Sequence, residues 1–263
     1  MLRHVYDSMI VFRFLNLLIL LSAACAQGHE ISEYFSAQEE GAFLLLDLAE
    51  DKRVIEYHPQ LCETRLSPCS TFKIPNALIG IDLGILQDET TLYKWDGSQQ
   101  LFTIWERDHT LESAVHYSAV WYFQKLAEEI GANEYRDYLM KFHYGNRDIS
   151  SGLTHFWLGK SLLISPVEQL NFLANLYRGN LPVTLKALET VKKILILERT
   201  PTWILSGKTG TNYEQHLGWF VGHIRVGEKE YVFVTCMRGG NASGTRAKTV
   251  AQEILQDLFN HSE

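Results

Sequence analysis

The spacing of apolar residues changes along the chain, and this change limits the folds that the sequence can adopt. Residues 41–48 and 54–57 are rich in strand-forming side chains and flank the charged run 50–53, which predicts a β-hairpin with a charged turn. Towards the carboxyl end, residues 203–208, 217–225 and 231–237 are again typical of strands and are joined by short turns that contain Gly. We therefore expect strands at both ends of the chain.

The middle of the chain and its last segment follow the spacing of helices instead. Ser165, Pro166 and Glu168 form a strong helix start, with a capping serine, a proline at the first helical position and a glutamate three residues after the cap. Further helices are predicted over residues 70–84, 118–130, 133–143, 185–197 and 247–258.

Together these signals predict an α+β fold. We expect an antiparallel β-sheet built from both chain ends, flanked by helices, with an all-helical subdomain inserted in the middle. Residues 27–263 would form a single unit, with an α/β part at residues 27–84 and 200–263 and a mostly helical part at residues 85–199. A chain of 263 residues, 46% of them hydrophobic, is long enough to bury such a core.

The first residues have the features of a secretory signal peptide. An apolar block at residues 10–24 ends in Ala24-Cys25-Ala26, which is typical of a cleavage site, and it is too short and too interrupted for a membrane span. We therefore predict a signal peptide at residues 1–26, with Met1 or Met9 as the start, and an exported protein that does not stay inserted in the membrane. A lipid anchor at Cys25 is less favoured, because Ser22 stands where lipoprotein signals usually have Leu.

Composition argues against nucleic-acid binding and against a metal site, and it leaves the state of Cys62 and Cys69 open. The net charge is −7 and no run of Lys or Arg occurs, which argues against nucleic acid. The 10 His show no H-E-x-x-H spacing and the Cys show no C-x-x-C, so no metal site is predicted. Cys62 and Cys69 could form a disulfide in an oxidising compartment, or they could be small buried apolar residues.

Ser70-Thr71-Phe72-Lys73 is the only S-x-x-K in the sequence. On a helix, Ser70 and Lys73 share one face. A serine hydroxyl becomes a good nucleophile when an adjacent base takes its proton, and a lysine can be that base once it has lost its charge. Free N–H groups at a helix start near Ser70 would also face a developing oxyanion. The alternative is a helix cap beside a solvated lysine, because one S-x-x-K is expected by chance in a chain of this length.

Four other candidates carry little weight individually. Lys208-Thr209-Gly210 ends a predicted strand and offers a cation, a hydroxyl and a place where a ligand can approach the backbone. Ser118-Ala119-Val120 is preferred over Ser113-Ala114-Val115, because only the former directly begins a clear amphipathic helix, although its serine could be just a cap. Trp157 could be a core aromatic whose N–H needs a partner, and Arg246 a surface residue or a site for an anionic ligand.

In this order, S-T-F-K, S-A-V, Y-G-N at 144–146, W-L at 157–158 and K-T-G resemble the class D (oxacillinase-type) serine β-lactamases. The resemblance covers essentially the whole mature chain and implies the transpeptidase fold that β-lactamases share with penicillin-binding proteins. Class A fits less well, because no S-D-N follows the nucleophile and Glu168-Gln169-Leu170-Asn171 is one residue too short for the E-x-x-L-N motif.

The resemblance also implies an activity and a role for each matching residue. A β-lactam antibiotic would acylate Ser70, and N-carboxylated Lys73, which needs CO2 or bicarbonate but no other cofactor, would be the general base for acylation and deacylation. Ser118 and Lys208 would relay protons to the leaving nitrogen. The remaining implied groups are a carbamate pocket of Phe72, Val120, Trp157 and Leu158, an oxyanion hole of the Ser70 and Thr211 N–H groups, and a substrate site of Thr209, Gly210 and Arg246, with Thr209 and Arg246 at the substrate carboxylate.

Two related functions remain as alternatives. A penicillin-sensor domain of similar sequence is acylated and then stalls, and a small penicillin-binding protein acting on cell-wall peptides shares S-x-x-K and K-T-G. The predicted signal peptide favours a free periplasmic bacterial enzyme over a tethered sensor, and the predicted carbamate pocket favours it over a penicillin-binding protein. The enzyme would act on small-molecule β-lactams as a monomer or a homodimer.

Overall fold

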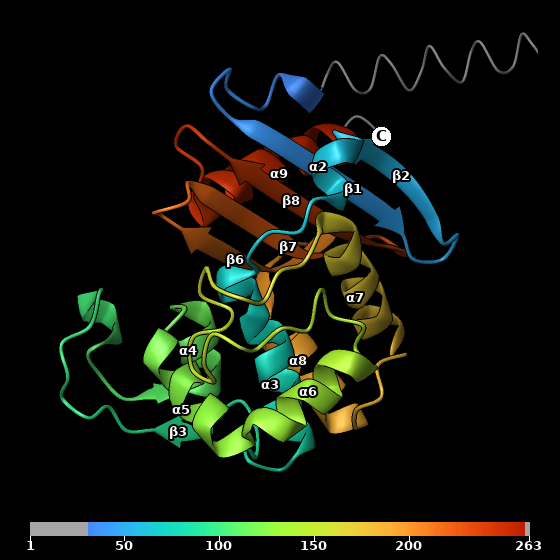
Figure 1. Cartoon of the computed structure of the whole chain (residues 1–263). Coiled ribbons are helices and arrows are strands. Elements are labelled where there is room, and N and C mark those ends of the chain that lie inside the picture. Colours follow the sequence, from blue (N-terminus) through green and yellow to red (C-terminus); the bar gives the residue numbers. More distant parts are fainter. Residues whose placement is uncertain (1–30, 261–263) are drawn as a thin grey trace, which may run out of the picture.

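The centre of the molecule is one antiparallel sheet with the strand order β2-β1-β8-β7-β6-β5 (Figure 1). The computed structural model describes residues 31–260, so the predicted signal peptide and Cys25 lie outside the described residues. Strands from the two chain ends are neighbours, because β1 pairs along its length with β8, and the predicted α+β class is thereby confirmed. The strands are β1 (Glu40–Asp47), β2 (Lys52–Tyr57), β5 (Ile196–Arg199), β6 (Trp203–Asn212), β7 (Leu217–Val226) and β8 (Lys229–Arg238).

Helices cover both faces of this sheet. α9 (Gly244–Asn260) packs on one face, mainly against β7, β8 and β6, and a larger helical part packs on the other face (Figure 1). A separate two-stranded ladder is formed by β3 (Leu92–Tyr93) and β4 (His109–Thr110). The other elements are α2 (Pro59–Glu63), the 3-10 turn η1 (Cys69–Phe72), α3 (Lys73–Asp82), the 3-10 turn η2 (Thr103–Trp105), α4 (Leu111–His116), α5 (Val120–Ile130), α6 (Ala132–Lys141), α7 (Pro166–Arg178) and α8 (Leu185–Ile194).

The sheet separates two hydrophobic cores. In β1, Ala42 and Leu44 point into the core shared with the helical part, whereas Phe43 and Leu45 point into the core beneath α9. Successive side chains of a strand face opposite sides. Because both sides are covered, β1 is a nearly continuous apolar run rather than an alternating one.

Several predicted boundaries need correction. The helix predicted to reach residue 197 ends at Ile194, and residues 196–199 form β5, because pairing with β6 overrides the helical spacing of the sequence. β6 continues past Lys208 to Asn212, since its residues pair with β7 as far as Leu217. α5 begins at Val120, so Ser118 lies in the turn before the helix. The predicted start of α7 is confirmed, with Ser165 and Glu168 forming the capping box.

Cys62 and Cys69 are both free and buried in this structure, so the disulfide considered between them is not formed. The Cys62 thiol donates a hydrogen bond to the Tyr57 carbonyl at 3.3 Å, and the Cys69 thiol donates to the Ser67 carbonyl at 3.5 Å. Each sulfur therefore has a backbone partner of its own. Burial raises the pKa of the Cys62 thiol to about 12 and that of Cys69 to about 11, so neither is a reactive thiolate near neutral pH.

Within residues 31–260, none of the helices combines the length and the apolar composition that crossing a membrane would require.

Candidate active site

Ser70 lies in η1, the 3-10 turn that leads directly into α3. The side-chain nitrogen of Lys73 (Nζ) lies 2.8 Å from Ser70 Oγ. The contact predicted from the three-residue spacing is therefore present. Cys69, just before the serine, has a φ of 50°, in the left-handed region that residues other than glycine rarely adopt. The chain therefore turns sharply before Ser70, and the first turn of the helical segment presents the hydroxyl.

The surroundings of Lys73 favour its uncharged form. Its side chain is fully buried, and this loss of hydration lowers its pKa well below the usual range of a lysine, with a further contribution from the positive charge of Lys208. No carboxylate within residues 31–260 forms an ion pair with Lys73. A neutral amine beside Ser70 can accept the proton of the hydroxyl, which a charged ammonium cannot.

A second lysine and a second serine are also in contact in the site. Lys208 extends from β6, and its Nζ donates a hydrogen bond to Ser118 Oγ at 2.5 Å and another to the Thr209 carbonyl at 3.0 Å. Burial lowers the pKa of Lys208 to about 7, so this group exchanges a proton easily near neutral pH. Ser118 has a φ of 57°, in the left-handed region, and lies in the turn between α4 and α5.

The two serines of the repeated S-A-V motif differ in their contacts. Ser113 lies inside α4, where it forms a capping box with Thr110 and its hydroxyl also contacts His109 Nδ1 at 2.9 Å. Ser113 therefore supports the local helix start. Ser118 is the one of the two that reaches Lys208, in agreement with the preference drawn from the sequence.

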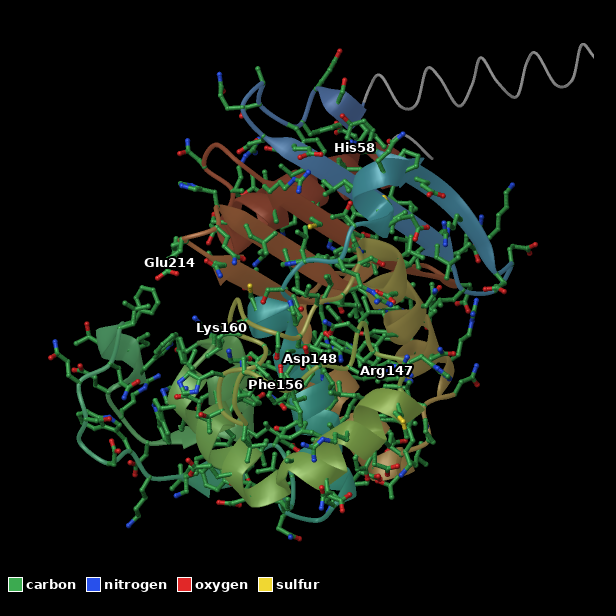
Figure 2. All side chains as sticks on the ribbon, in the orientation of Figure 1. His58, Arg147, Asp148, Phe156, Lys160 and Glu214 are labelled. Carbon is green, nitrogen blue, oxygen red and sulfur yellow. The ribbon has the colours of Figure 1, made fainter. Side chains whose placement is uncertain are left out.

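Aromatic rings surround the buried side chain of Lys73. Phe72 packs against Trp157 with ring centroids 5.7 Å apart and against Phe156 at 5.1 Å. Phe156 is the side chain labelled at the centre of the helical part in Figure 2. Phe123, which the sequence analysis did not single out, lies below Lys73 with its ring centroid 5.4 Å from Nζ.

Trp157 carries an unusual feature for a buried residue. Its side chain is fully buried, yet its indole N–H has no hydrogen-bond partner among the described residues. A buried polar group without a partner is costly, and in a native protein it often marks a site for an absent ligand or ion. The Trp157 N–H is therefore a donor available to a group bound inside this pocket.

Gly210 allows β6 to approach the nucleophile closely. A β-carbon at this position would lie 2.9 Å from the Pro68 carbonyl oxygen and 3.1 Å from Thr71 Cγ2. β5 pairs with β6 only as far as Ser206, so residues 208–212 form an open strand edge beside η1. Thr211, on this edge, accepts a hydrogen bond from the Gly244 N–H at 2.8 Å, which ties the edge to α9.

These groups open into a cavity of about 610 Å³. Six of the twelve predicted catalytic and binding residues line it, namely Ser70, Ser118, Val120, Leu158, Thr209 and Thr211. Two exposed apolar side chains at its mouth, Leu101 (74% exposed) and Tyr213 (64% exposed), come from loops whose position could not be predicted. Further apolar residues that line the cavity and that the sequence analysis did not single out are Phe102, Ile104, Trp105 and Tyr117.

Arg246 is not among the residues that line the cavity. Its guanidinium donates hydrogen bonds to the Glu39 carboxylate at 3.2 Å and to the Tyr34 carbonyl at 2.7 Å. The predicted contact of Arg246 with substrate stays a prediction; in this structure Arg246 is turned towards the segment before β1, where the Glu39 carboxylate attracts it.

The Y-G-N motif supports the site without lining it. The Asn146 amide donates to the Ser161 carbonyl at 2.8 Å and accepts from the Leu163 N–H at 2.9 Å. A β-carbon on Gly145 would lie 2.0 Å from the Leu163 carbonyl oxygen, so only glycine fits there. The motif thus holds the loop that carries Trp157 and Leu158.

The part of the chain that the structure describes contains no group of three or more His, Cys, Asp or Glu side chains able to hold a metal ion.

Comparisons with known proteins agree with this geometry. Residues 35–258 match the family model of the penicillin binding protein transpeptidase domain. The probable beta-lactamase YbxI of Bacillus subtilis (strain 168) is 43% identical over 218 residues, which cover 82% of this chain and 80% of that protein. The regulatory protein BlaR1 of Bacillus licheniformis is 38% identical over 225 residues, and this match covers 84% of this chain and 37% of that protein. The solved structure of the class D beta-lactamase BAT-2 is similar with a TM-score of 0.83 at 41% identity, covering 87% of this chain and 94% of that one.

Proposed function

Because the chain belongs to the class D serine β-lactamases, within the penicillin-binding-protein transpeptidase family, we propose that it hydrolyses β-lactams through an acyl-enzyme on Ser70. The Ser70 hydroxyl attacks the lactam carbonyl, the amide C–N bond breaks, and water then hydrolyses the resulting ester. This sequence of steps needs a base, donors for the oxyanion and a proton for the departing nitrogen.

Lys73 supplies the base. The observation that carries the proposal is the 2.8 Å contact between Ser70 Oγ and the Nζ of a fully buried lysine whose pKa is lowered by burial. A neutral amine in this place takes the hydroxyl proton as the serine attacks. Proton transfer by a positioned base contributes about 100-fold to 10,000-fold to a rate.

The residues around Lys73 fit a carboxylated lysine. CO2 reacts with the neutral form of an amine, and burial favours that form here. The unpartnered Trp157 N–H would donate to the added carboxylate, while Phe72, Val120 and Leu158 keep the pocket apolar. When present, the carbamate would supply an anionic oxygen base for the serine proton and for the hydrolytic water.

Lys208 and Ser118 supply the proton to the leaving nitrogen. With a pKa of about 7, Lys208 is close to half protonated near neutral pH, and its hydrogen bond to Ser118 provides a path for the proton. The Ser118 hydroxyl lines the cavity together with Ser70, which supports its role as the group that touches the substrate.

The Ser70 and Thr211 N–H groups form the oxyanion hole in this proposal. Ser70 lies in the first turn of the helical segment, and Thr211 lies on the open edge of β6. Gly210 supports this role, because it lets β6 lie against η1 at a distance that a side chain would prevent. Removal of one such donor costs about 100-fold to 1,000-fold in other hydrolases.

Hydrolysis of a chromogenic cephalosporin by purified residues 27–263, with and without added bicarbonate, tests this function. Steady turnover that rises with bicarbonate is expected. Turnover without any response to bicarbonate would leave a β-lactamase but contradict the carboxylated lysine. No reaction with Ser70 would contradict the function itself.

A sensor function is the second candidate, because the regulatory protein BlaR1 is 38% identical over the matched region. A sensor would be acylated at Ser70 and would keep the acyl group. The same assay separates the two functions: one rapid stoichiometric burst without turnover would favour the sensor, and many turnovers per molecule favour the enzyme.

We also propose that residues 27–263 are the single catalytic unit released by cleavage after Ala26 and exported to the periplasm. Mass spectrometry of the protein recovered from the bacterial periplasm would test both points. An amino terminus at Gln27 is expected, and a lipid-modified terminus at Cys25 would contradict the proposal.

A further inference from the structure

Ser67 connects the segment before the nucleophile to the loop that carries Trp157. Its hydroxyl donates a hydrogen bond to the Trp157 carbonyl at 3.0 Å and accepts one from the Gly159 N–H at 2.9 Å. Within residues 31–260, neither of these backbone groups has a different hydrogen-bond partner. Ser67 is only 2% exposed, so the two contacts are made away from bulk solvent.

The backbone of Ser67 is held from the side of the sheet. The indole N–H of Trp219, a fully buried residue of β7, donates to the Ser67 carbonyl at 2.9 Å. Ser67 also stands three residues before Ser70, the nucleophile of the proposed reaction. The Ser67 hydroxyl therefore reaches the loop from a point that is fixed relative to both the sheet and η1.

The two contacts act on the part of the loop that closes the Lys73 pocket. They hold the two peptide units on either side of Leu158, which lines the cavity that contains Ser70. Further along the loop, Leu66 and Ile164 exchange backbone hydrogen bonds of 2.9 and 2.8 Å. Because this second anchor does not involve the Ser67 hydroxyl, the loop stays attached when that hydroxyl is lost.

Loss of the hydroxyl would leave a buried carbonyl and a buried N–H without partners. Such groups are costly, so water would enter or the loop would shift until both were satisfied. Either change affects the neighbouring Trp157 indole, whose N–H has no partner among the described residues and is the proposed donor to carboxylated Lys73.

We propose that Ser67 is a positioning residue for the Lys73 pocket, and that its hydroxyl fixes the backbone of residues 157–159 so that the indole N–H and Leu158 stay in place. This inference rests on the proposed β-lactamase function and on carboxylation of Lys73. It goes beyond them by assigning the geometry of the pocket to a residue that touches neither Lys73 nor the substrate cavity in this structure.

Ser67→Ala tests this role, because it removes the hydroxyl and keeps the carbonyl that Trp219 contacts. We expect the bicarbonate concentration that gives half-maximal turnover of a chromogenic cephalosporin to rise about 10-fold, as for the loss of one or two hydrogen bonds. At saturating bicarbonate, kcat should return close to the value of the unmodified protein. Below saturation, the carbamate signal in a 13C NMR spectrum with labelled bicarbonate should be weaker in the variant.

Ser165→Ala is the matched control. Ser165 is also 2% exposed, and its hydroxyl accepts a hydrogen bond from the Glu168 N–H at 3.2 Å at the start of α7. Loss of this cap should lower the melting temperature without changing the response to bicarbonate. A comparable shift in both variants would show that the response follows stability, and would overturn the positioning role.

The remaining outcomes separate this inference from the proposed function. An unchanged half-maximal bicarbonate concentration in folded Ser67→Ala would overturn the positioning role while hydrolysis by the unmodified protein stood. Absence of a carbamate signal in the unmodified protein would overturn carboxylation and the role of Ser67 together, and absence of hydrolysis would overturn the function.

Trp219→Phe provides a second test if circular dichroism shows that Ser67→Ala does not fold. This change releases the Ser67 carbonyl and leaves the Ser67 hydroxyl in place. The half-maximal bicarbonate concentration should rise by a smaller factor, about 3-fold. No rise in this variant would contradict the inference.

Discussion

Lys208 Nζ and Ser118 Oγ are 2.5 Å apart, although 90 residues separate them in the sequence. This contact joins the sheet to the turn between α4 and α5, so the two parts of the molecule meet at a proton-exchanging pair. Two lysine–serine pairs therefore contribute to the site, and the serine of each pair lines the same cavity.

Replacement of Lys73 by alanine should separate the two stages of the reaction. Acylation of Ser70 should continue slowly, because the hydroxyl and the oxyanion donors remain, whereas deacylation should slow at least 100-fold without the base. Intact-protein mass spectrometry should therefore show a long-lived acyl-enzyme. Lys94→Ala, at an exposed lysine, is the matched control. Turnover at the unmodified rate in Lys73→Ala would contradict the role of Lys73.

Replacement of Trp157 by phenylalanine should weaken retention of CO2. The change removes the unpartnered indole N–H but keeps an aromatic ring in the pocket. We expect lower activity in CO2-depleted buffer, partial recovery with bicarbonate, and a weaker carbamate signal in a 13C NMR spectrum recorded with labelled bicarbonate. Trp203→Phe is the control, since the Trp203 N–H already donates to Glu198. An unaltered carbamate signal in Trp157→Phe would show that the indole is not a carbamate donor.

Lys208 should make stability depend on pH. Its pKa is about 7 in the folded protein, against 10.5 for a free lysine side chain. Below pH 7 both states are protonated and the folded state bears the full cost of the buried charge, and above 10.5 neither state is charged and the cost is absent. The free energy of unfolding should therefore rise between these values, by about 1.4 kcal/mol for each pH unit.

Lys208→Met should remove this part of the pH dependence. Between about pH 7.5 and pH 9.5, urea unfolding should show a gain in stability about 2 to 3 kcal/mol smaller in the variant than in the unmodified protein. Loss of Lys208 also removes a positive charge that helps to lower the pKa of Lys73, which reduces the Lys73 contribution in the variant and acts in the same direction. Parallel stability profiles for the two proteins would mean that Lys208 is not buried as a titrating group.

Gly210→Ala should reduce the rate more than it weakens substrate binding. The new β-carbon would lie 2.9 Å from the Pro68 carbonyl, so β6 must move away from η1 and the Thr211 N–H must move with it. We expect kcat to fall at least 10-fold, a fraction of the loss seen when an oxyanion donor is removed. Steady-state kinetics will show this, and a circular dichroism spectrum will show that the fold is kept. An unchanged kcat would mean that the approach of β6 is unimportant.

The sequence predicted the parts of the site that depend on local spacing. Ser70 and Lys73 are three residues apart on one helical segment, so their contact follows from the geometry of a turn. The α+β class, with a sheet built from both chain ends, followed from the strand patterns at those ends, and β1 lies beside β8. The order of motifs along the chain then indicated which distant residues meet.

Features that depend on one side chain finding a distant partner were not predictable. The direction of Arg246 is set by Glu39, which is 207 residues away and gave no signal in the sequence. β5 resembled a continuation of α8, because its four residues carry helix-forming side chains and only pairing with β6 makes them a strand. The apolar mouth of the cavity depends on loop conformations that no periodic pattern encodes.

Cys69 and Ser118, with φ angles of 50° and 57°, have a consequence for how this chain could change over evolutionary time. Glycine relieves backbone strain at such positions, so Ser118→Gly would raise tolerance to heat while removing a hydroxyl that the reaction needs. If Ser118 acts as proposed, selection for stability and selection for activity therefore act on its codon in opposite directions. Where activity is not selected, Ser118→Gly should be accepted, and the fold should become more stable.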